Sequence, residues 1–152
     1  MSYSFEYIDI ILLAMIAGFI FYSGKLIYSG DFVFKNRAPG EGMYIIMRGS
    51  IKITIGTRSG NENILAELEK GEFFGELALF DDEPRSANAI AIEDCKLLGF
   101  FTQDLMILKE RNPLLGHKIM FNLGGLLGER LRKTNKLLKS MGDSSRNIYK
   151  LD

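Results

Sequence analysis

One stretch of sequence decides both the fold and the candidate site: Phe73-Phe74-Gly75-Glu76-Leu77-Ala78-Leu79-Phe80-Asp81-Asp82-Glu83-Pro84-Arg85-Ser86-Ala87. A flexible glycine precedes a carboxylate and a short apolar turn, and an acidic loop then leads to an arginine beside a hydroxyl. Free backbone amides at the start of a helical turn attract an anion. Arg85 can fork two bonds onto phosphate oxygens, and Glu76 can accept a hydrogen bond from a ribose hydroxyl. The stretch therefore predicts a site for a sugar phosphate.

The composition limits the classes of function that this chain can have. With 152 residues and 47% hydrophobic content, it is long enough for one domain with a real core. Lys plus Arg equals Asp plus Glu at 19 each, and the net charge of zero argues against nonspecific nucleic-acid binding. A single cysteine, Cys95, excludes an intrachain disulfide and fits a reducing compartment. Because His117 is the single histidine, we expect no metal site, no catalytic residues and no enzyme.

Residues 1–24 form an apolar N-terminal segment, which is uncharged from Ile10 to Gly24. As a helix, this run of about 15 residues spans about 22 Å, against about 30 Å for a hydrocarbon core. Extending it to 7–24 narrows the gap, so the segment is predicted either as a membrane anchor or as a helix buried on the domain. If it spans the inner or plasma membrane, acid before the run and base after it place the folded part in the cytoplasm.

Residues 25–101 alternate short apolar runs rich in β-formers with tight-turn residues. Such a pattern predicts a mainly β fold, a sandwich or barrel with its edges rolled together, because helices between the strands are almost absent. The predicted strands are Leu26–Tyr28, Phe32–Phe34, Met43–Met47, Ile51–Ile55, Ile64–Leu68, Ala87–Ile92 and Cys95–Phe101.

The hydrophobic period becomes helical from Thr102, and residues 102–141 are predicted as two C-terminal helices. The first begins with Thr102 as a cap and ends near Arg111, and the second begins at Asn112-Pro113. We expect Gly142 to end the second helix, with 142–152 as a flexible tail. No sequence remains in the chain for a DNA-reading helix-turn-helix.

Several motifs along the chain occur together in a known order: Gly30-Asp31-Phe32-Val33-Phe34, Pro39-Gly40-Glu41-Gly42-Met43-Tyr44-Ile45-Ile46, Gly49, Phe74-Gly75-Glu76-Leu77-Ala78-Leu79 and Pro84-Arg85-Ser86-Ala87. The chain resembles the cyclic nucleotide-binding domain family over roughly 25–140. This family includes catabolite activator protein, the regulatory subunit of protein kinase A and cyclic-nucleotide-gated channels. The resemblance implies an eight-stranded β-roll of the jelly-roll kind, with flanking helices of which the last forms a lid.

The resemblance also implies roles for individual residues. Glu76 matches the position that binds the ribose 2′-hydroxyl, and Arg85 matches the position that pairs with the cyclic phosphate. Ser86 corresponds to a contact to phosphate or base, and Ala87 to a backbone amide on the phosphate. Backbone groups are expected to approach the ligand at Gly75, Leu77 and Ala78. From the last helix, Arg130 or Thr134 could reach the base.

Alternatives to these assignments remain open. Glu76 and Arg85 could form a salt bridge beside an empty pocket, while the acidic Asp81, Asp82 and Glu83 should point to solvent. At Arg37-Ala38 the chain departs from the family pattern, in a turn expected to lie away from the phosphate motif.

The last helix has features that admit more than one interpretation. Its glycines, Gly124, Gly125 and Gly128, allow a bending lid, a close helix–helix homodimer or tight packing against the roll. The basic stretch with Arg130, Arg132, Lys133, Lys136 and Lys139 is predicted to be a solvated face.

The favoured function is a regulatory sensor that binds cyclic AMP or cyclic GMP and signals through its lid helix to a separate, unidentified effector. The alternative is a membrane-tethered structural or adaptor β-roll whose pocket is unused. A cupin-type enzyme is disfavoured, because it needs several metal-binding histidines.

Overall fold

The structure of the protein, a computed structural model, describes residues 23–56 and 62–148, with side chains described for 24–56 and 62–140. Of the candidate membrane anchor at 7–24, all but Ser23 and Gly24 lie outside the described residues, and these two belong to the first strand. Among the helices that are described, none is long and apolar enough to cross a bilayer.

The described residues contain eight strands in two four-stranded antiparallel sheets, which confirms the predicted mainly β roll with C-terminal helices. One sheet has the order β1-β8-β3-β6, and the other has the order β2-β7-β4-β5. The strands are β1 (Ser23–Ile27), β2 (Phe32–Phe34), β3 (Gly42–Arg48), β4 (Ile51–Gly56), β5 (Glu62–Leu68), β6 (Phe73–Phe74), β7 (Asn88–Ala91) and β8 (Cys95–Phe101).

The predicted strands are found close to their expected bounds, and the short strand β6 was missed. Its two residues pair with Tyr44 and Ile45 of β3, which lie some thirty residues earlier in the chain. A two-residue strand has no period of its own, so local sequence gives no signal for it.

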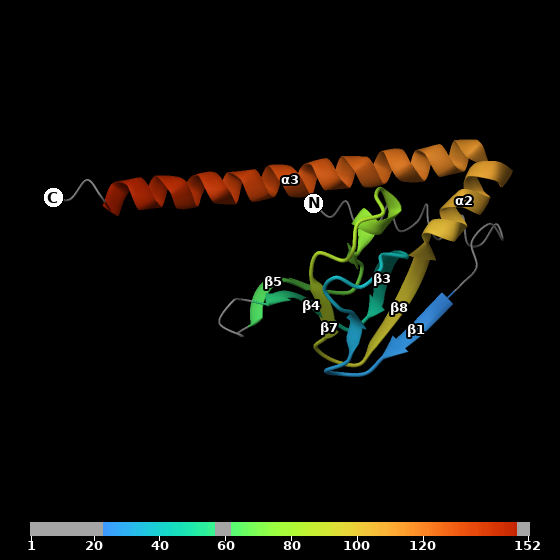
Figure 1. Ribbon diagram of the computed structural model, residues 1–152, viewed down its shortest axis with the longest axis horizontal. Coiled ribbons are helices and arrows are strands. Elements are labelled where there is room, and N and C mark those ends of the chain that lie inside the picture. Colours follow the sequence, from blue (N-terminus) through green and yellow to red (C-terminus); the bar gives the residue numbers. More distant parts are fainter. Residues whose placement is uncertain (1–22, 57–61, 149–152) are drawn as a thin grey trace.

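A 3-10 helix and two α-helices complete the described fold: η1 (Glu76–Leu79), α2 (Thr102–Arg111) and α3 (Pro113–Ile148). Figure 1 shows α3 lying across one end of the roll and continuing well past it. The predicted break at Gly142 is wrong, because α3 runs on to Ile148. One glycine costs a helix only about 1 kcal/mol, and no proline follows to stop it.

The two helix starts differ in how well the sequence predicted them. Thr102 was expected to cap α2, but it is the first helical residue, and the Phe101 N–H is bonded to Asp104 Oδ2 at 2.8 Å. The Thr102 hydroxyl instead donates to the carbonyls of Glu41 and Ala78, at 3.2 Å each. At α3 the prediction is confirmed, because Pro113 opens the helix and Asn112 Oδ1 accepts the Leu115 N–H at 3.1 Å.

The core has two parts. One lies inside the roll and is built around Ile46, Ile51 and Leu97. The other joins the outer face of β3 and β8 to the helices, through residues such as Phe100, Leu108 and Ile119. Burial of this second cluster fixes the first turns of α3 on the roll.

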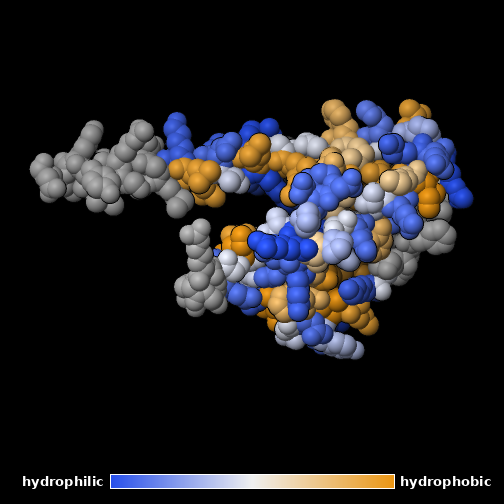
Figure 2. Space-filling view, in the orientation of Figure 1, coloured by the Kyte–Doolittle hydropathy of each residue, from blue (hydrophilic) through white to orange (hydrophobic). Residues whose placement is uncertain are grey.

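Three of the glycines of α3, Gly124, Gly125 and Gly128, do not pack against the roll. A Cβ added at Gly124 or Gly125 would meet nothing within 4 Å, and one at Gly128 would meet Arg132 Nη1 at an ordinary 3.5 Å. Beyond Leu123, α3 carries exposed apolar side chains, among them Leu131, Leu137 and Leu138. Figure 2 shows hydrophobic surface on the part of α3 that projects past the roll. Tight packing on the roll is therefore not the reason for these glycines, which leaves bending or a helix–helix contact.

Two glycine substitutions test this account with opposite signs. We expect Gly49→Ala to lower the free energy of unfolding by about 2–4 kcal/mol, because φ is +87° and the new Cβ would lie 2.6 Å from Cys95 Sγ and 2.8 Å from Asp94 O. Gly125→Ala should raise the free energy of unfolding by about 0.5–1 kcal/mol, because alanine loses less backbone entropy than glycine when the helix forms. The new Cβ would meet none of the described residues within 4 Å. Urea denaturation followed by circular dichroism measures both, and equal effects would contradict the account.

Candidate functional site

Gly75 turns the chain from β6 into η1 in a left-handed conformation, with φ +77°. A Cβ at this position would lie 2.7 Å from Arg85 Nη1 and 3.3 Å from the carbonyl oxygen of Gly42, so a side chain is excluded by space as well as by backbone angle. The turn aims the first residue of η1, Glu76, into the interior, where it is 7% exposed.

The guanidinium of Arg85 is buried and held by two carbonyl groups. Arg85 is 8% exposed; its Nη1 donates to Gly75 O at 2.9 Å and its Nη2 to Gly42 O at 2.7 Å. Among the described residues, Arg85 Nε is buried with no hydrogen-bond partner. An unpaired buried donor costs about 1–3 kcal/mol, so the two carbonyls satisfy this guanidinium only in part.

Burial lowers the pKa of Arg85, and the nearby Tyr44, Glu41 and Glu76 partly offset that effect. Burial also raises the pKa of the Tyr44 hydroxyl, against the opposing effect of Arg85. Arginine starts from so high a pKa that it keeps its charge at neutral pH. The site therefore presents a desolvated cation, which interacts strongly with an anion.

The Arg37-Ala38 turn, expected to lie away from the phosphate motif, is bonded directly to Arg85. The Arg37 N–H donates to Arg85 O at 2.7 Å, and the Arg85 N–H donates to Ala38 O at 2.9 Å. Arg37 itself adopts φ +65°, a conformation that a non-glycine residue rarely takes. The expectation was wrong because strand pairing brings the end of β2 against the residues before β7, a contact that sequence distance does not reveal.

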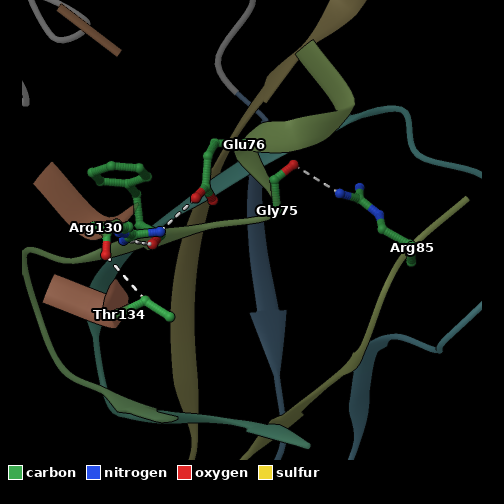
Figure 3. A network of polar contacts seen from close by, with 6 residues as sticks. Gly75, Glu76, Arg85, Arg130 and Thr134 are labelled. Carbon is green, nitrogen blue, oxygen red and sulfur yellow. Dashed lines mark hydrogen bonds and ion pairs between the residues drawn. The ribbon is translucent and has the colours of Figure 1, made fainter. Parts of the chain in front are cut away.

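The anticipated ion pair between Glu76 and Arg85 is not formed, because Glu76 pairs with Arg130 of α3 instead. Arg130 Nη1 lies 2.5 Å from Glu76 Oε1, and Arg130 Nη2 donates to Phe73 O at 2.8 Å. The Arg130 guanidinium also covers the Phe73 ring, 4.3 Å from its centroid. Figure 3 shows this contact on one side of Gly75 and Arg85 on the other. The Thr134 hydroxyl is bonded to Arg130 O at 3.1 Å.

These groups line one pocket of about 550 Å³, a volume suited to a small ligand. It brings together every residue predicted to bind, and they come from the turn around η1, the segment before β7 and the middle of α3. They are Gly75, Glu76, Leu77, Ala78, Arg85, Ser86, Ala87, Arg130 and Thr134.

Sequence reasoning missed part of the lining. An apolar wall comes from β4 and β5, where Ile53 pairs with Ala66 and Leu68 lies two positions further along. Alternation from the buried Ile51 would have placed Ile53 on the inner face. Further lining residues that were not predicted are Phe34, Glu72, Phe74, Asp81, Glu83, Pro84 and Lys133.

The charged residues near the pocket behave partly as expected. Asp81, Asp82 and Glu83 are exposed, as predicted, although Asp81 and Glu83 also line the pocket. The basic stretch of α3 is not wholly a solvated face, because Arg130 is paired inside and Lys133 lines the pocket. The helical spacing of 130, 133 and 134 was the available signal for this shared face. Within the described residues, His, Cys, Asp and Glu form no group of three or more that could hold a metal ion.

Comparison with known proteins gives a consistent result. Residues 25–112 match the family described as Cyclic nucleotide-binding domain. The Cyclic AMP receptor protein of Thermus thermophilus is 36% identical over 115 residues, covering 76% of this chain and 51% of that protein. The cGMP-dependent protein kinase 2 of Homo sapiens is 38% identical over 66 residues, covering 43% of this chain and 9% of the kinase. The chain thus spans about half the length, or less, of these curated relatives.

Solved structures agree with the sequence matches. The crystal structure of the Thermus thermophilus Catabolite Activator Protein has a TM-score of 0.72 and 33% identity, and the match covers 88% of this chain and 59% of that one. The N-terminal domain of a transcriptional regulator from Streptomyces coelicolor has a TM-score of 0.65 and 32% identity, with 81% of each chain covered.

Removing Arg130 should weaken the contact between α3 and the roll. We expect Arg130→Ala to lower the free energy of unfolding by about 1–2 kcal/mol, because it strands a buried carboxylate and removes a cation from the Phe73 ring. Arg132→Ala, an exposed neighbour on the same helix, is the control and should change stability by less than about 0.5 kcal/mol. Equal effects of the two substitutions in urea denaturation would show that the ion pair does not hold α3.

Proposed function

The chain belongs to the cyclic nucleotide-binding domain family, and on that premise we propose that its pocket binds cyclic AMP or cyclic GMP as the input of a regulatory module. The observation that carries the proposal is the buried cation of Arg85, which lines the same pocket as the buried carboxylate of Glu76. A ligand that carries an anionic group and an adjacent hydroxyl can bind both residues, the anion at the Arg85 guanidinium and the hydroxyl at the Glu76 carboxylate.

At one end of the pocket, the cyclic phosphate would accept N–H groups of the Arg85 guanidinium. Nη1 and Nη2 each already bind one carbonyl, of Gly75 and Gly42, and each keeps a second N–H for the anion. The exposed Ser86 hydroxyl and the Ala87 amide lie in the same lining and would add donors. A hydroxyl at Ser86 also keeps cyclic GMP open, because it can reach a purine in the syn conformation.

The ribose would bind at Glu76. The Oε1 atom of this carboxylate is occupied by Arg130, so the other oxygen would accept the 2′-hydroxyl. The base would then lie toward α3, against Ile53, Ala66 and Leu68, with Thr134 and Lys133 at its edge. Arg130 and Thr134 therefore fit the role of lid contacts.

The output of the module would pass through α3 to a separate effector protein or to a second copy of the chain. Arg130 connects the middle of α3 to the ribose-binding carboxylate, so a ligand on Glu76 changes the contact that holds the helix. Among the described residues, nothing lies within 4 Å of a Cβ placed at Gly124 or Gly125, and these two glycines suit either bending of the helix or close contact with a second helix. In this proposal the chain is regulatory and does not itself catalyse a reaction.

Titration with fluorescent cyclic AMP and, in parallel, fluorescent cyclic GMP tests the proposal. We expect saturable binding by the full chain, and Arg85→Ala and Glu76→Ala should each weaken it by about 10- to 100-fold, because each removes charge-assisted hydrogen bonds. Arg48→Ala, an exposed arginine of β3 outside the pocket lining, should bind as the unchanged chain does.

The absence of saturable binding with both nucleotides at millimolar concentration would overturn the proposal. That result would favour the other candidate, a structural or adaptor roll in which Arg85 and Glu76 serve their internal partners alone.

A further inference from the structure

Arg85 has an aromatic neighbour, Phe34, to which the sequence motifs assigned no role in binding. The guanidinium carbon of Arg85 lies 4.2 Å from the centroid of the Phe34 ring, on β2. Phe34 is half-buried and lines the pocket. A cation this close to a ring centroid is attracted by the negative face of the π system, and arginine favours this arrangement.

The ring limits where the guanidinium can go. The guanidinium lies over the ring, while the Gly75 and Gly42 carbonyls accept two of its N–H groups. Gly75 leaves no spare room beside the guanidinium, because a Cβ at this position would lie 3.2 Å from Phe34 Cε1 and 2.7 Å from Arg85 Nη1. The ring attracts the cation without accepting a conventional hydrogen bond, so each terminal nitrogen keeps a second N–H for another acceptor.

The ring is itself supported from behind. Its centroid lies 5.8 Å from that of Phe74 and 6.3 Å from that of Tyr44, and the Tyr44 and Phe74 rings stack at 5.7 Å. A ring packed against two other rings has few positions available, so it is a firm support for the cation above it.

We propose that Phe34 is a positioning residue for anion recognition: its ring fixes the Arg85 guanidinium in the orientation in which the second N–H of each terminal nitrogen can bind the phosphate. This inference rests on the proposed function, since it concerns how the same pocket grips its ligand. It adds a determinant of affinity that touches the ligand-binding arginine through its π face rather than through a hydrogen bond.

The same strand offers a matched control. The neighbouring Phe32 also carries a cation over its ring, with Lys35 Nζ 4.9 Å from the centroid, but it lies outside the pocket lining. A change at Phe32 therefore removes an equivalent ring and an equivalent type of contact without touching Arg85.

The test measures the affinity of the full chain for cyclic AMP by isothermal titration calorimetry, with circular dichroism confirming the fold of each variant. Phe34→Leu should weaken binding by about 3- to 30-fold, whereas Phe34→Tyr, which retains the ring, and Phe32→Leu should stay within about twofold. Replacing Phe34 by 3,4,5-trifluorophenylalanine keeps the shape and weakens the negative face, so affinity should fall in the same direction. In an Arg85→Gln background, Phe34→Leu should have no further effect, because the cation is gone.

Three results would overturn the inference while leaving the proposed function intact: unchanged binding by folded Phe34→Leu, unchanged binding by the trifluoro variant, or an equal loss for Phe34→Leu in the Arg85→Gln background. Failure of the unchanged chain to bind cyclic AMP and cyclic GMP would instead count against the proposed function.

If the unchanged chain binds neither nucleotide, or if Phe34→Leu does not fold, nuclear magnetic resonance tests the contact between Phe34 and Arg85 without a ligand. The ring should shift the Arg85 guanidinium proton resonances upfield in the unchanged chain. An Arg85 spectrum without a ring-current shift would contradict the stacking.

Discussion

The two hydrogen bonds from the Arg85 guanidinium to the carbonyls of Gly75 and Gly42 are the contact on which the site depends. They join the turn before η1 to the first residue of β3, two segments more than thirty residues apart in sequence. The backbone of Arg85 is tied in turn to Arg37 and Ala38. One buried cation thus fixes three segments of the roll, and the absence of a side chain at Gly75 makes room for it.

The placement of this cation explains how one residue can serve both fold and function. A buried charge needs partners, and two neutral carbonyls satisfy it only in part. Each terminal nitrogen keeps a second N–H that can bind a ligand. At the other side of Gly75, the carboxylate of Glu76 is satisfied by Arg130 of α3. The pocket therefore has one group whose partners lie within the roll, and one whose partner lies on the helix that covers it.

Local sequence was enough to predict many of the strands and much of the candidate site. The strands from Phe32 to Phe34 and from Cys95 to Phe101 were predicted with their observed bounds, because turn residues separate short apolar runs. Clustering of Gly75 to Ala78 with Arg85 to Ala87 followed from motif order. Each of these predictions depends on residues close together in sequence or on a spacing that the family resemblance supplied.

What the sequence could not provide depends on contacts between distant segments. A salt bridge of Glu76 with Arg85 was one alternative, but the partner of Glu76 is Arg130, because the reach of α3 over the roll is set by the packing of α2 and Leu123. The bonds from the Arg37-Ala38 turn to Arg85 follow from strand pairing, and so does the stacking of Phe34. Each of these contacts joins two segments that are distant in sequence, and the hydrophobic periodicity within a single segment does not encode such contacts.

The central claim is that Arg85 and Glu76 grip the two ends of one cyclic nucleotide. A crystal structure of the chain grown with cyclic AMP tests it most directly. We expect a cyclic phosphate oxygen within hydrogen-bond distance of an Arg85 guanidinium nitrogen, and the ribose 2′-hydroxyl on a carboxylate oxygen of Glu76. Cyclic AMP bound with its phosphate away from Arg85, or crystals whose pocket holds no nucleotide at saturating concentration, would contradict it.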